Sequence, residues 1–280
     1  MREPILPGKD GITMKMLKRL AALLLAVVCC TSSAFAASKK KKNEKNGPRD
    51  ITTEVVQEVP GKIQELLDLA YAEWLETDGA NLKRSNKYSK WRTNTDIGWC
   101  GAFVTYLMLQ LEIPQKGKND TPREEVPGIV HVKEAGVGKL YDGYEHMNRL
   151  TMVPQKGFIV VFGNAKSFNG TGATKAYHVG LVYDVEKLSD GKYRITTIEG
   201  AVDSPGDATH PKAGYTVRMY VRDYDMNAEK LSKNLTLVPE EERTQEESAL
   251  FTYSYTYNNP GLYIFSFLMP WIPGEDIPAE

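Results

Sequence analysis

One cysteine, one histidine and one glutamate in this chain have local sequences that suit nucleophilic catalysis. Cys100 lies in Gly98-Trp99-Cys100-Gly101-Ala102, His178 opens the apolar stretch 178–183, and Glu199 closes Thr197-Ile198-Glu199. A nucleophile, a general base and an acid that orients the base are the three parts of a cysteine hydrolase. We therefore take Cys100, His178 and Glu199 as candidate catalytic residues.

Cys100 stands where a helix is expected to begin. A thiol in the first turn of a helix is exposed to the positive end of the helix dipole, which favours the thiolate form. The small residues Gly101 and Ala102 would let a substrate carbonyl approach the backbone, whose N–H groups could form part of an oxyanion hole. The competing interpretation is a small buried hydrophobic residue without chemistry.

His178 and Glu199 each have an ordinary interpretation as well. A histidine at the start of a strand, after the polar loop 163–175, is placed to face a cleft, but a lone histidine of this kind is more often a surface residue than a base. A glutamate at a strand end is most often an exposed charge. The catalytic interpretation depends on all three residues meeting in space.

The first 36 residues have the pattern of a secretory signal peptide. Lys15, Lys18 and Arg19 precede an unbroken apolar run, residues 20–30, and Ala34-Phe35-Ala36 supplies small residues for cleavage. The apolar run is too short for a transmembrane helix, which needs about 20 residues. We expect an exported protein of the cell envelope or the medium that begins at Ala37 and has no stable membrane insertion.

Composition and charge restrict the remaining possibilities. With 41% hydrophobic and 25% charged residues the chain is neither disordered throughout nor a polytopic membrane protein. After cleavage, 30 basic and 34 acidic residues remain, so there is no charge signature for nucleic acid. Cleavage also removes Cys29 and Cys30, which leaves Cys100 as the one cysteine of the mature chain.

We divide the chain into a signal peptide (1–36), a basic disordered linker (37–52), a catalytic domain (53–275) and a short tail (276–280). Apolar residues at helical spacing from Ile63 to Trp74 predict an amphipathic helix, and Cys100–Leu111 predicts a helix buried on nearly every side. Strands are expected at 158–162, 177–185, 193–199, 215–221 and 262–268. The segment 115–150 is assigned as loop with one short helix, and 231–247 as an excursion between strands. Helices followed by an antiparallel sheet give an α+β fold.

The hairpin between His178 and Glu199 is a geometric test of the site. If Asp190 and Gly191 formed a strict two-residue turn, Glu199 would lie opposite Val182, about 13 Å from His178. The pair requires either a six-residue loop over 186–191 or an equivalent bulge, and we expect one of the two.

Taken together, these segments resemble the CHAP amidohydrolase/peptidase family. The resemblance covers roughly residues 59–273, and its most specific parts are the Trp99-Cys100 segment and His178-Val179-Gly180. It implies a papain-like fold and cleavage of amide bonds in bacterial peptidoglycan, either as an N-acetylmuramoyl-L-alanine amidase or as a peptide endopeptidase. It also implies Cys100 as nucleophile, His178 as base and Glu199 as the residue that orients the base.

Two positions depart from the family pattern, and they keep alternatives open. Phe158 stands where an acidic residue is frequent, and Ala201 stands where an asparagine commonly follows Glu-Gly. The alternatives are a protein that binds envelope peptides without cutting them, and a protein peptidase or acyltransferase with the same cysteine and histidine. No zinc-ligand spacing or nucleotide-binding motif occurs, so we expect no metal or other cofactor. His131, His146 and His210 are interpreted as surface residues.

Overall fold

The computed structural model describes residues 48–77, 80–92, 98–117, 126–165, 176–204, 214–242 and 261–276. The predicted signal peptide, most of the predicted linker and His210 lie outside these residues. The described part contains three α-helices and a seven-stranded antiparallel sheet, compatible with the expected α+β class. None of its helices is long and apolar enough to cross a bilayer.

The three α-helices precede all seven strands of the large sheet along the chain. They are α2 (Gly61–Thr77), α3 (Cys100–Gln110) and α4 (Val137–His146). The large sheet consists of β3 (Leu150–Thr151), β4 (Ile159–Asn164), β5 (His178–Ser189), β6 (Lys192–Ser204), β7 (Gly214–Asp225), β8 (Leu235–Leu237) and β9 (Leu262–Leu268). Its spatial order is β3-β9-β4-β5-β6-β7-β8. Two short parallel strands, β1 (Gln115–Lys116) and β2 (His131–Val132), form a separate small sheet, and 3₁₀ turns occur at Leu231–Lys233 and Glu240–Glu242.

Both predicted helices are confirmed, and α4 is the short helix expected within 115–150. The five predicted strands are present as β4, β5, β6, β7 and β9, although β6 continues past its expected end at Glu199. The short strands β1, β2, β3 and β8 were not predicted, since two or three residues carry no readable alternation.

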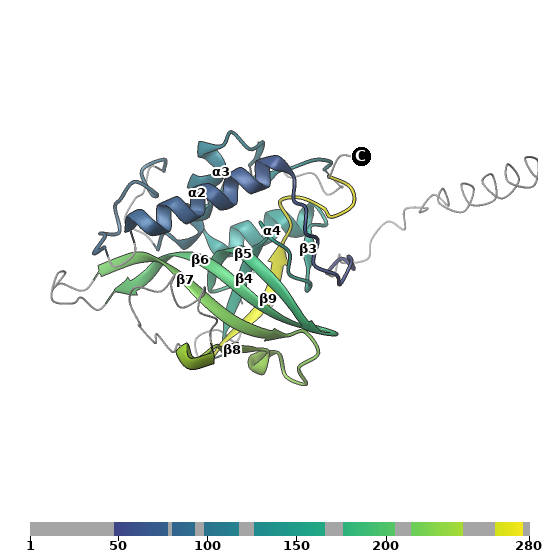
Figure 1. The fold of residues 1–280 in the computed structure, drawn as a ribbon. Helices are drawn as coiled ribbons and strands as arrows, with labels where there is room; N and C mark the ends of the chain where they lie inside the picture. The colour runs from purple at the N-terminus through teal and green to yellow at the C-terminus, as the bar shows by residue number, and fades with distance from the viewer. Residues whose placement is uncertain are drawn as a thin grey trace, which may run out of the picture. The chain divides into compact units, whose positions relative to one another are not determined.

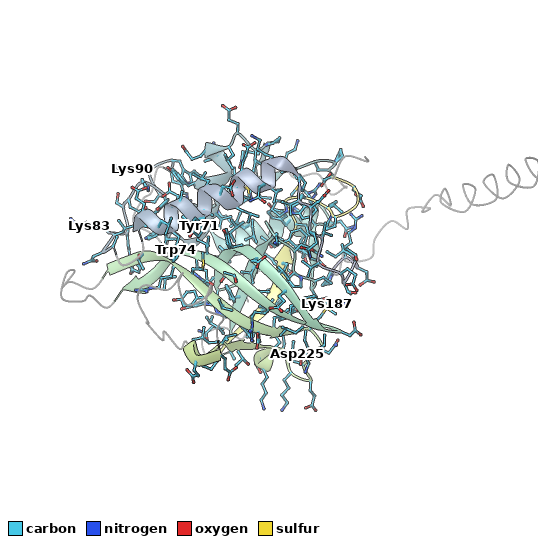
Figure 2. The ribbon with its side chains drawn as sticks, viewed as in Figure 1. Tyr71, Trp74, Lys83, Lys90, Lys187 and Asp225 are labelled. Atoms are coloured by element: carbon cyan, nitrogen blue, oxygen red, sulfur yellow. The ribbon has the colours of Figure 1, made fainter. Side chains whose placement is uncertain are left out.

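Helices α2 and α3 lie together on one face of the sheet (Figure 1). Tyr71 and Trp74 point from α2 toward the strands (Figure 2), and Tyr71 stacks on Tyr183 of β5 with ring centroids 5.7 Å apart. On the same side, Gly200 of β6 lies so close to Phe103 of α3 that an added Cβ would come within 2.6 Å of it. The buried stripe of α2 explains why it packs here: Ile63, Leu66, Leu67, Ala70 and Trp74 recur at helical spacing.

The sheet is curved, so that on the face opposite the helices residues of distant strands come into contact. Tyr224 of β7 makes an edge-to-face contact with Phe267 of β9, with centroids 5.6 Å apart, although three strands separate them in the sheet. The Asn234 side chain exchanges two hydrogen bonds of 2.8 and 2.9 Å with the backbone of Ile264. The concave face is therefore an enclosed interior, and residues that point into it are shielded from water.

The ends of the described chain meet each other. Residues 49–52, which were assigned to the linker, lie against residues 272–275, and the backbone N–H of Arg49 bonds to the carbonyl of Leu150. Asp276, assigned to the tail, accepts a 3.1 Å hydrogen bond from Gly128 N–H. Residues 49–52 and Asp276 therefore contact the predicted catalytic domain, although they lie outside its predicted limits of 53 and 275.

Candidate active site

Cys100 is the first residue of α3 and is a free thiol with 9% of its surface exposed. The N-cap residue Trp99 makes no side-chain hydrogen bond to the helix start, and the first turn of α3 contains no acidic residue. The N–H groups at this end, which lack partners within the helix, are therefore not screened by a nearby carboxylate of their own turn. The expected placement of the cysteine at a helix start is confirmed.

Close packing fixes the start of α3. A Cβ on Gly101 would lie 2.4 Å from the carbonyl oxygen of Ala135, and Ala102 is fully buried. Trp99 stacks on Tyr88 with centroids 5.1 Å apart. The small size of Gly101 is thus required by its packing against Ala135 and Leu140. It therefore gives no evidence by itself that a substrate carbonyl approaches on the Cβ side of this residue.

His178 is the first residue of β5, as predicted, and its side chain is 15% exposed. Its imidazole stacks on Phe162 of β4, with centroids 5.8 Å apart and an interplanar angle of 24°. Its Nε2 lies 3.0 Å from Glu199 Oε2. The Cys100 thiol lies close enough to the same imidazole for each group to shift the pKa of the other. The structure therefore brings together all three residues that the sequence singled out.

Glu199 reaches His178 by a route that the sequence analysis predicted only in part. Ser189 pairs with Lys192, so the turn consists of Asp190 and Gly191 and the six-residue loop is wrong. The alternative, a bulge, is found twice in the pairing of β5 with β6, and it brings Leu181 opposite Ile198. Continuing that register sets Glu199 beside Gly180, two residues short of His178.

Gly180 closes the remaining gap. A Cβ at this position would lie 2.5 Å from Glu199 Cγ, so the glutamate side chain lies across the space that any other residue would fill. Residues i and i+2 of a strand share one face, and Glu199 therefore extends along that face to the imidazole. The contact is diagonal across the hairpin rather than direct.

Arg222 and Thr197 also bind the carboxylate, and the sequence analysis did not identify either of them. Arg222 Nη1 donates hydrogen bonds to Glu199 Oε1 and, at 2.9 Å, to Thr197 Oγ1. Thr197 Oγ1 in turn donates to Glu199 Oε1 at 2.6 Å. Glu199 is 2% exposed, so these partners replace the water that an exposed carboxylate would have.

The charges of the site favour an ion pair between sulfur and imidazole. Burial disfavours the Cys100 thiolate, but the hydrogen bond and charge of His178, with the N–H groups of Val179 and Gly101, outweigh it and lower the pKa of the thiol. Burial likewise opposes the imidazolium, yet Cys100 and Glu199 together raise the pKa of His178 to about 10. Each group is charged because its neighbour is charged.

Glu199 stays ionised despite its burial. Desolvation would raise its pKa, but the charge of Arg222 and then the hydrogen bond and charge of His178 lower that pKa to about 2. An ionised, immobile carboxylate can hold the imidazole in one orientation and stabilise its protonated form. The arrangement has the chemical capacity for thiolate attack on a carbonyl followed by proton donation to a leaving group.

The two positions that depart from the family pattern have different surroundings. Phe158 is fully buried and packs edge-to-face on Trp271, with centroids 5.7 Å apart, so it is a core residue. Ala201 has a φ of 59° next to an irregularity in the pairing of β6 with β7. This left-handed conformation is one that Gly and Asn adopt more readily than Ala.

His131 does not lie on the surface, contrary to the prediction. It is fully buried behind α3, with Nε2 2.9 Å from Thr105 Oγ1 and Nδ1 2.9 Å from the Tyr144 hydroxyl. Burial lowers the pKa of His131 to about 3, so it is neutral in the folded protein. The residues next to His131 in the sequence do not indicate these two hydrogen-bonding partners, because Thr105 and Tyr144 are distant along the chain. His146 is partly exposed.

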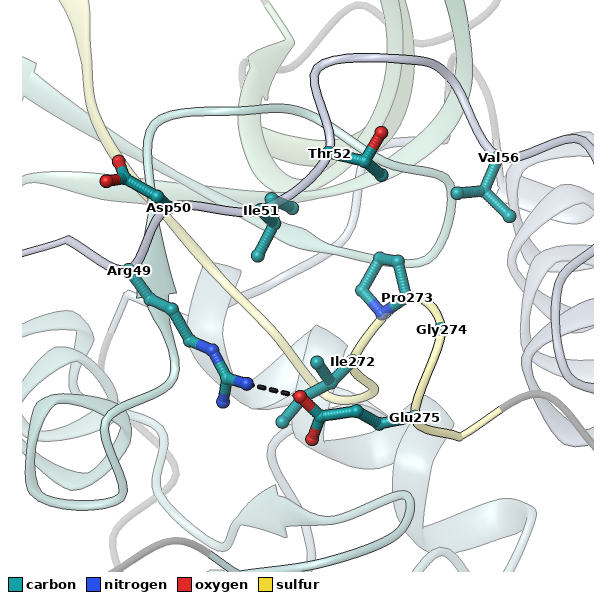
Figure 3. A pocket seen from close by; sticks show the side chains of 9 residues that line it. All are labelled: Arg49, Asp50, Ile51, Thr52, Val56, Ile272, Pro273, Gly274 and Glu275. Atoms are coloured by element: carbon teal, nitrogen blue, oxygen red, sulfur yellow. Dashed lines mark hydrogen bonds and ion pairs between the residues drawn. The ribbon is translucent and has the colours of Figure 1, made fainter. Parts of the chain in front are cut away.

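A pocket of about 510 Å³ lies away from these residues, between segments 49–56 and 272–275. Arg49 and Glu275 form an ion pair across its mouth, and Ile51, Val56 and Pro273 supply apolar walls (Figure 3). None of the three candidate catalytic residues lines it. Within the described residues no cluster of three or more His, Cys, Asp or Glu side chains is arranged to hold a metal ion.

Comparison of the chain with protein-family models, with curated proteins and with solved structures finds no significant match.

Proposed function

We propose that this protein is a papain-like cysteine hydrolase that cleaves amide bonds of bacterial peptidoglycan, with Cys100 as nucleophile, His178 as base and Glu199 as the orienting acid. The observation that carries the proposal is the convergence of these side chains from α3, β5 and β6: His178 lies 3.0 Å from Glu199, and it lies close enough to Cys100 for each to shift the pKa of the other. The substrate class rests on the resemblance to the CHAP family and on the predicted secretory signal.

The proposed reaction proceeds through a thioester. The Cys100 thiolate attacks the carbonyl carbon of the amide, and N–H groups at the start of α3 stabilise the oxyanion that forms. The C–N bond breaks as the leaving amine takes the proton from the His178 imidazolium. Water then attacks the thioester and gives a proton to His178, the acid product leaves, and the thiolate is restored. The sum is one amide and one water converted to one acid and one amine.

Glu199 contributes to both halves of this cycle. It fixes the imidazole so that one ring nitrogen faces the sulfur while Nε2 is held by the carboxylate, as the 3.0 Å contact requires. Because it remains charged, it stabilises the imidazolium that exists before the amine departs. A group in this role changes the rate more than it changes substrate binding.

The test is mass analysis of purified wall material after incubation with the mature protein. New fragments released by the wild type and not by Cys100→Ala support the proposal, and the new chain ends identify either an amidase or an endopeptidase. Wild type that binds wall fragments firmly without releasing any would favour the peptide-binding alternative. Turnover of an unrelated protein substrate, with intact wall, would favour the protein peptidase.

A further inference from the structure

Arg222 lies inside the curled sheet and is held from several sides. It is 6% exposed, and its guanidinium donates to both Glu199 oxygens as well as to Thr197. A buried guanidinium is costly to desolvate and adds little net stability when paired. Stability alone therefore does not explain the presence of Arg222 in this interior.

Aromatic rings hold the guanidinium in place and connect it to the base. The ring centroid of Tyr220 lies 4.2 Å from Arg222 Cζ, and that of Phe162 lies 5.0 Å from it. Phe162 also stacks on His178. Arg222 does not need to touch the imidazole itself: it contacts the Glu199 carboxylate and the Phe162 ring, and each of these contacts His178. Arginine is suited to both contacts because it is planar and forked, whereas lysine offers one point charge.

The charges of the four groups alternate in sign. Thiolate, imidazolium, carboxylate and the Arg222 guanidinium sum to zero in the reactive form, and Arg218 is a further buried cation opposite Glu199. Loss of the Arg222 guanidinium would remove one positive charge from the side of the carboxylate that it contacts, in a water-poor interior. The loss favours uptake of a proton, and the thiolate accepts it most readily because a thiol has a far higher ordinary pKa than a carboxyl group.

The titratable and charged groups that face this cluster come from four elements of the described structure. They are Cys100 of α3, His178 of β5, Glu199 of β6, and Arg218, Tyr220 and Arg222 of β7, while β4 contributes the apolar ring of Phe162. Arg218 lies opposite Glu199 in register, and His178, Thr197 and Arg222 hydrogen-bond to the Glu199 carboxylate.

We propose that Arg222 is a positioning residue that keeps Glu199 ionised and aimed at His178, and that it thereby sets the pH at which Cys100 becomes a thiolate. This inference deepens the proposed cysteine chemistry and depends on it, but it does not depend on peptidoglycan being the substrate.

The experiment is the rate of Cys100 alkylation by iodoacetamide, followed from pH 4 to 10 in wild type, Arg222→Gln and Arg222→Lys. We expect the midpoint in the Gln variant to rise by about one to two pH units, because the thiolate loses its charge balance. The Lys variant, which keeps the charge without the fork, should rise by less. The matched control is Arg194→Gln, which removes an arginine paired with Asp223 between the same two strands but on the other face. Its midpoint should equal that of wild type.

An unchanged midpoint in folded Arg222→Gln overturns the proposal, as does a rise of equal size in Arg194→Gln. Urea unfolding of each variant shows which of them are folded, and if the Gln variant is not, an unshifted midpoint in Arg222→Lys together with unimpaired hydrolysis overturns it. Wild type that is alkylated at the same pH as the unfolded chain refutes both Arg222 and the cysteine mechanism. Wild type with an activated thiol but no wall hydrolysis refutes only the substrate.

Discussion

Gly180→Ala is the most direct test of how the hairpin positions the acid. The new Cβ would lie 2.5 Å from Glu199 Cγ and 3.3 Å from the Ile198 carbonyl oxygen. Ordinary contacts between such atoms begin near 3.5 Å, so Glu199 must withdraw by about 1 Å. Gly180 has no positive φ, so alanine brings no backbone strain and the effect comes from the collision alone.

The size of the effect follows from the hydrogen bond that is lost. Glu199 Oε2 lies 3.0 Å from His178 Nε2, and a further 1 Å takes the contact beyond hydrogen-bonding distance. A misplacement of about 1 Å in a catalytic group costs roughly 100-fold in rate, or about 2.7 kcal/mol of barrier. The same overpacking should lower the free energy of unfolding by about 1–3 kcal/mol.

Three measurements separate these effects: fragment release from purified wall, the pH profile of Cys100 alkylation, and unfolding in urea. The control is Gly61→Ala at the start of α2, where an added Cβ meets nothing within 4 Å. We expect a large loss of release in folded Gly180→Ala and no change in Gly61→Ala. A Gly180→Ala protein that is folded and fully active, with an unchanged pH profile, would refute the diagonal contact as the support of the site.

The remaining predictions concern the mutant chemistry, the backbone, pH and processing. Glu199→Gln should lower turnover by about 100-fold or more with little change in fragment affinity, whereas equal losses in both would argue against an orienting role. Ala201→Gly should raise the free energy of unfolding by up to about 1 kcal/mol, because φ is 59° there; a lower urea midpoint would contradict this. His131 has a folded pKa of about 3, below its unfolded value of 6.5, so the unfolded chain binds the extra proton between these pH values. The contribution of neutral His131 to the free energy of unfolding is thus full above pH 6.5 and decreases as the pH is lowered, by about 2 kcal/mol at pH 5. The His131→Gln variant should show a weaker dependence of the free energy of unfolding on pH in this range. The exported protein should begin at Ala37, and the intact mass of protein from culture fluid tests this.

The helices and the longer strands could be predicted because their signals are local. The apolar stripe of α2 and the continuous apolar run of α3 specify which faces are buried, and both helices form where expected. The start of α3 at Cys100 and of β5 at His178 also followed from local pattern. These two boundaries determine which ends of the elements carry the candidate side chains, and the two ends lie close together in the structure.

The hairpin register could not be predicted, because a bulge has no sequence signal as strong as that of a turn. Asp190-Gly191 is a strong turn signal and forms the turn, with Gly191 at a φ of 68°. The two irregularities in β5 pairing shift Glu199 by two positions, and nothing in the strand composition indicates where they occur. His131 was misassigned for a related reason: its partners Thr105 and Tyr144 come from separate helices.

Arg222 was missed because its role exists only in the folded sheet. It is 23 residues from Glu199 along the chain, and an arginine among alternating residues of a strand is usually a solvated charge. The curl of the sheet turns that face into an interior, and there the same residue becomes the counter-ion of a buried carboxylate. A sequence pattern shows which residues share a face of the sheet. Whether that face is exposed to solvent depends on contacts such as that of Tyr224 with Phe267, whose strands are separated by three others in the sheet.

The geometry also explains why glycine and glutamate occur together in the hairpin. Diagonal neighbours across an antiparallel pair lie roughly 7–8 Å apart, with their Cβ atoms somewhat closer, and a carboxylate bridges this distance only if its side chain is long and its path is clear. Glu199 supplies the length, and Gly180 supplies the path. An aspartate at position 199 would be one methylene short of His178, and a side chain at position 180 would block a glutamate. The distance from His178 to the acid thus depends on two residues on different strands. Replacing either Gly180 or Glu199 would break the contact between the carboxylate and the imidazole.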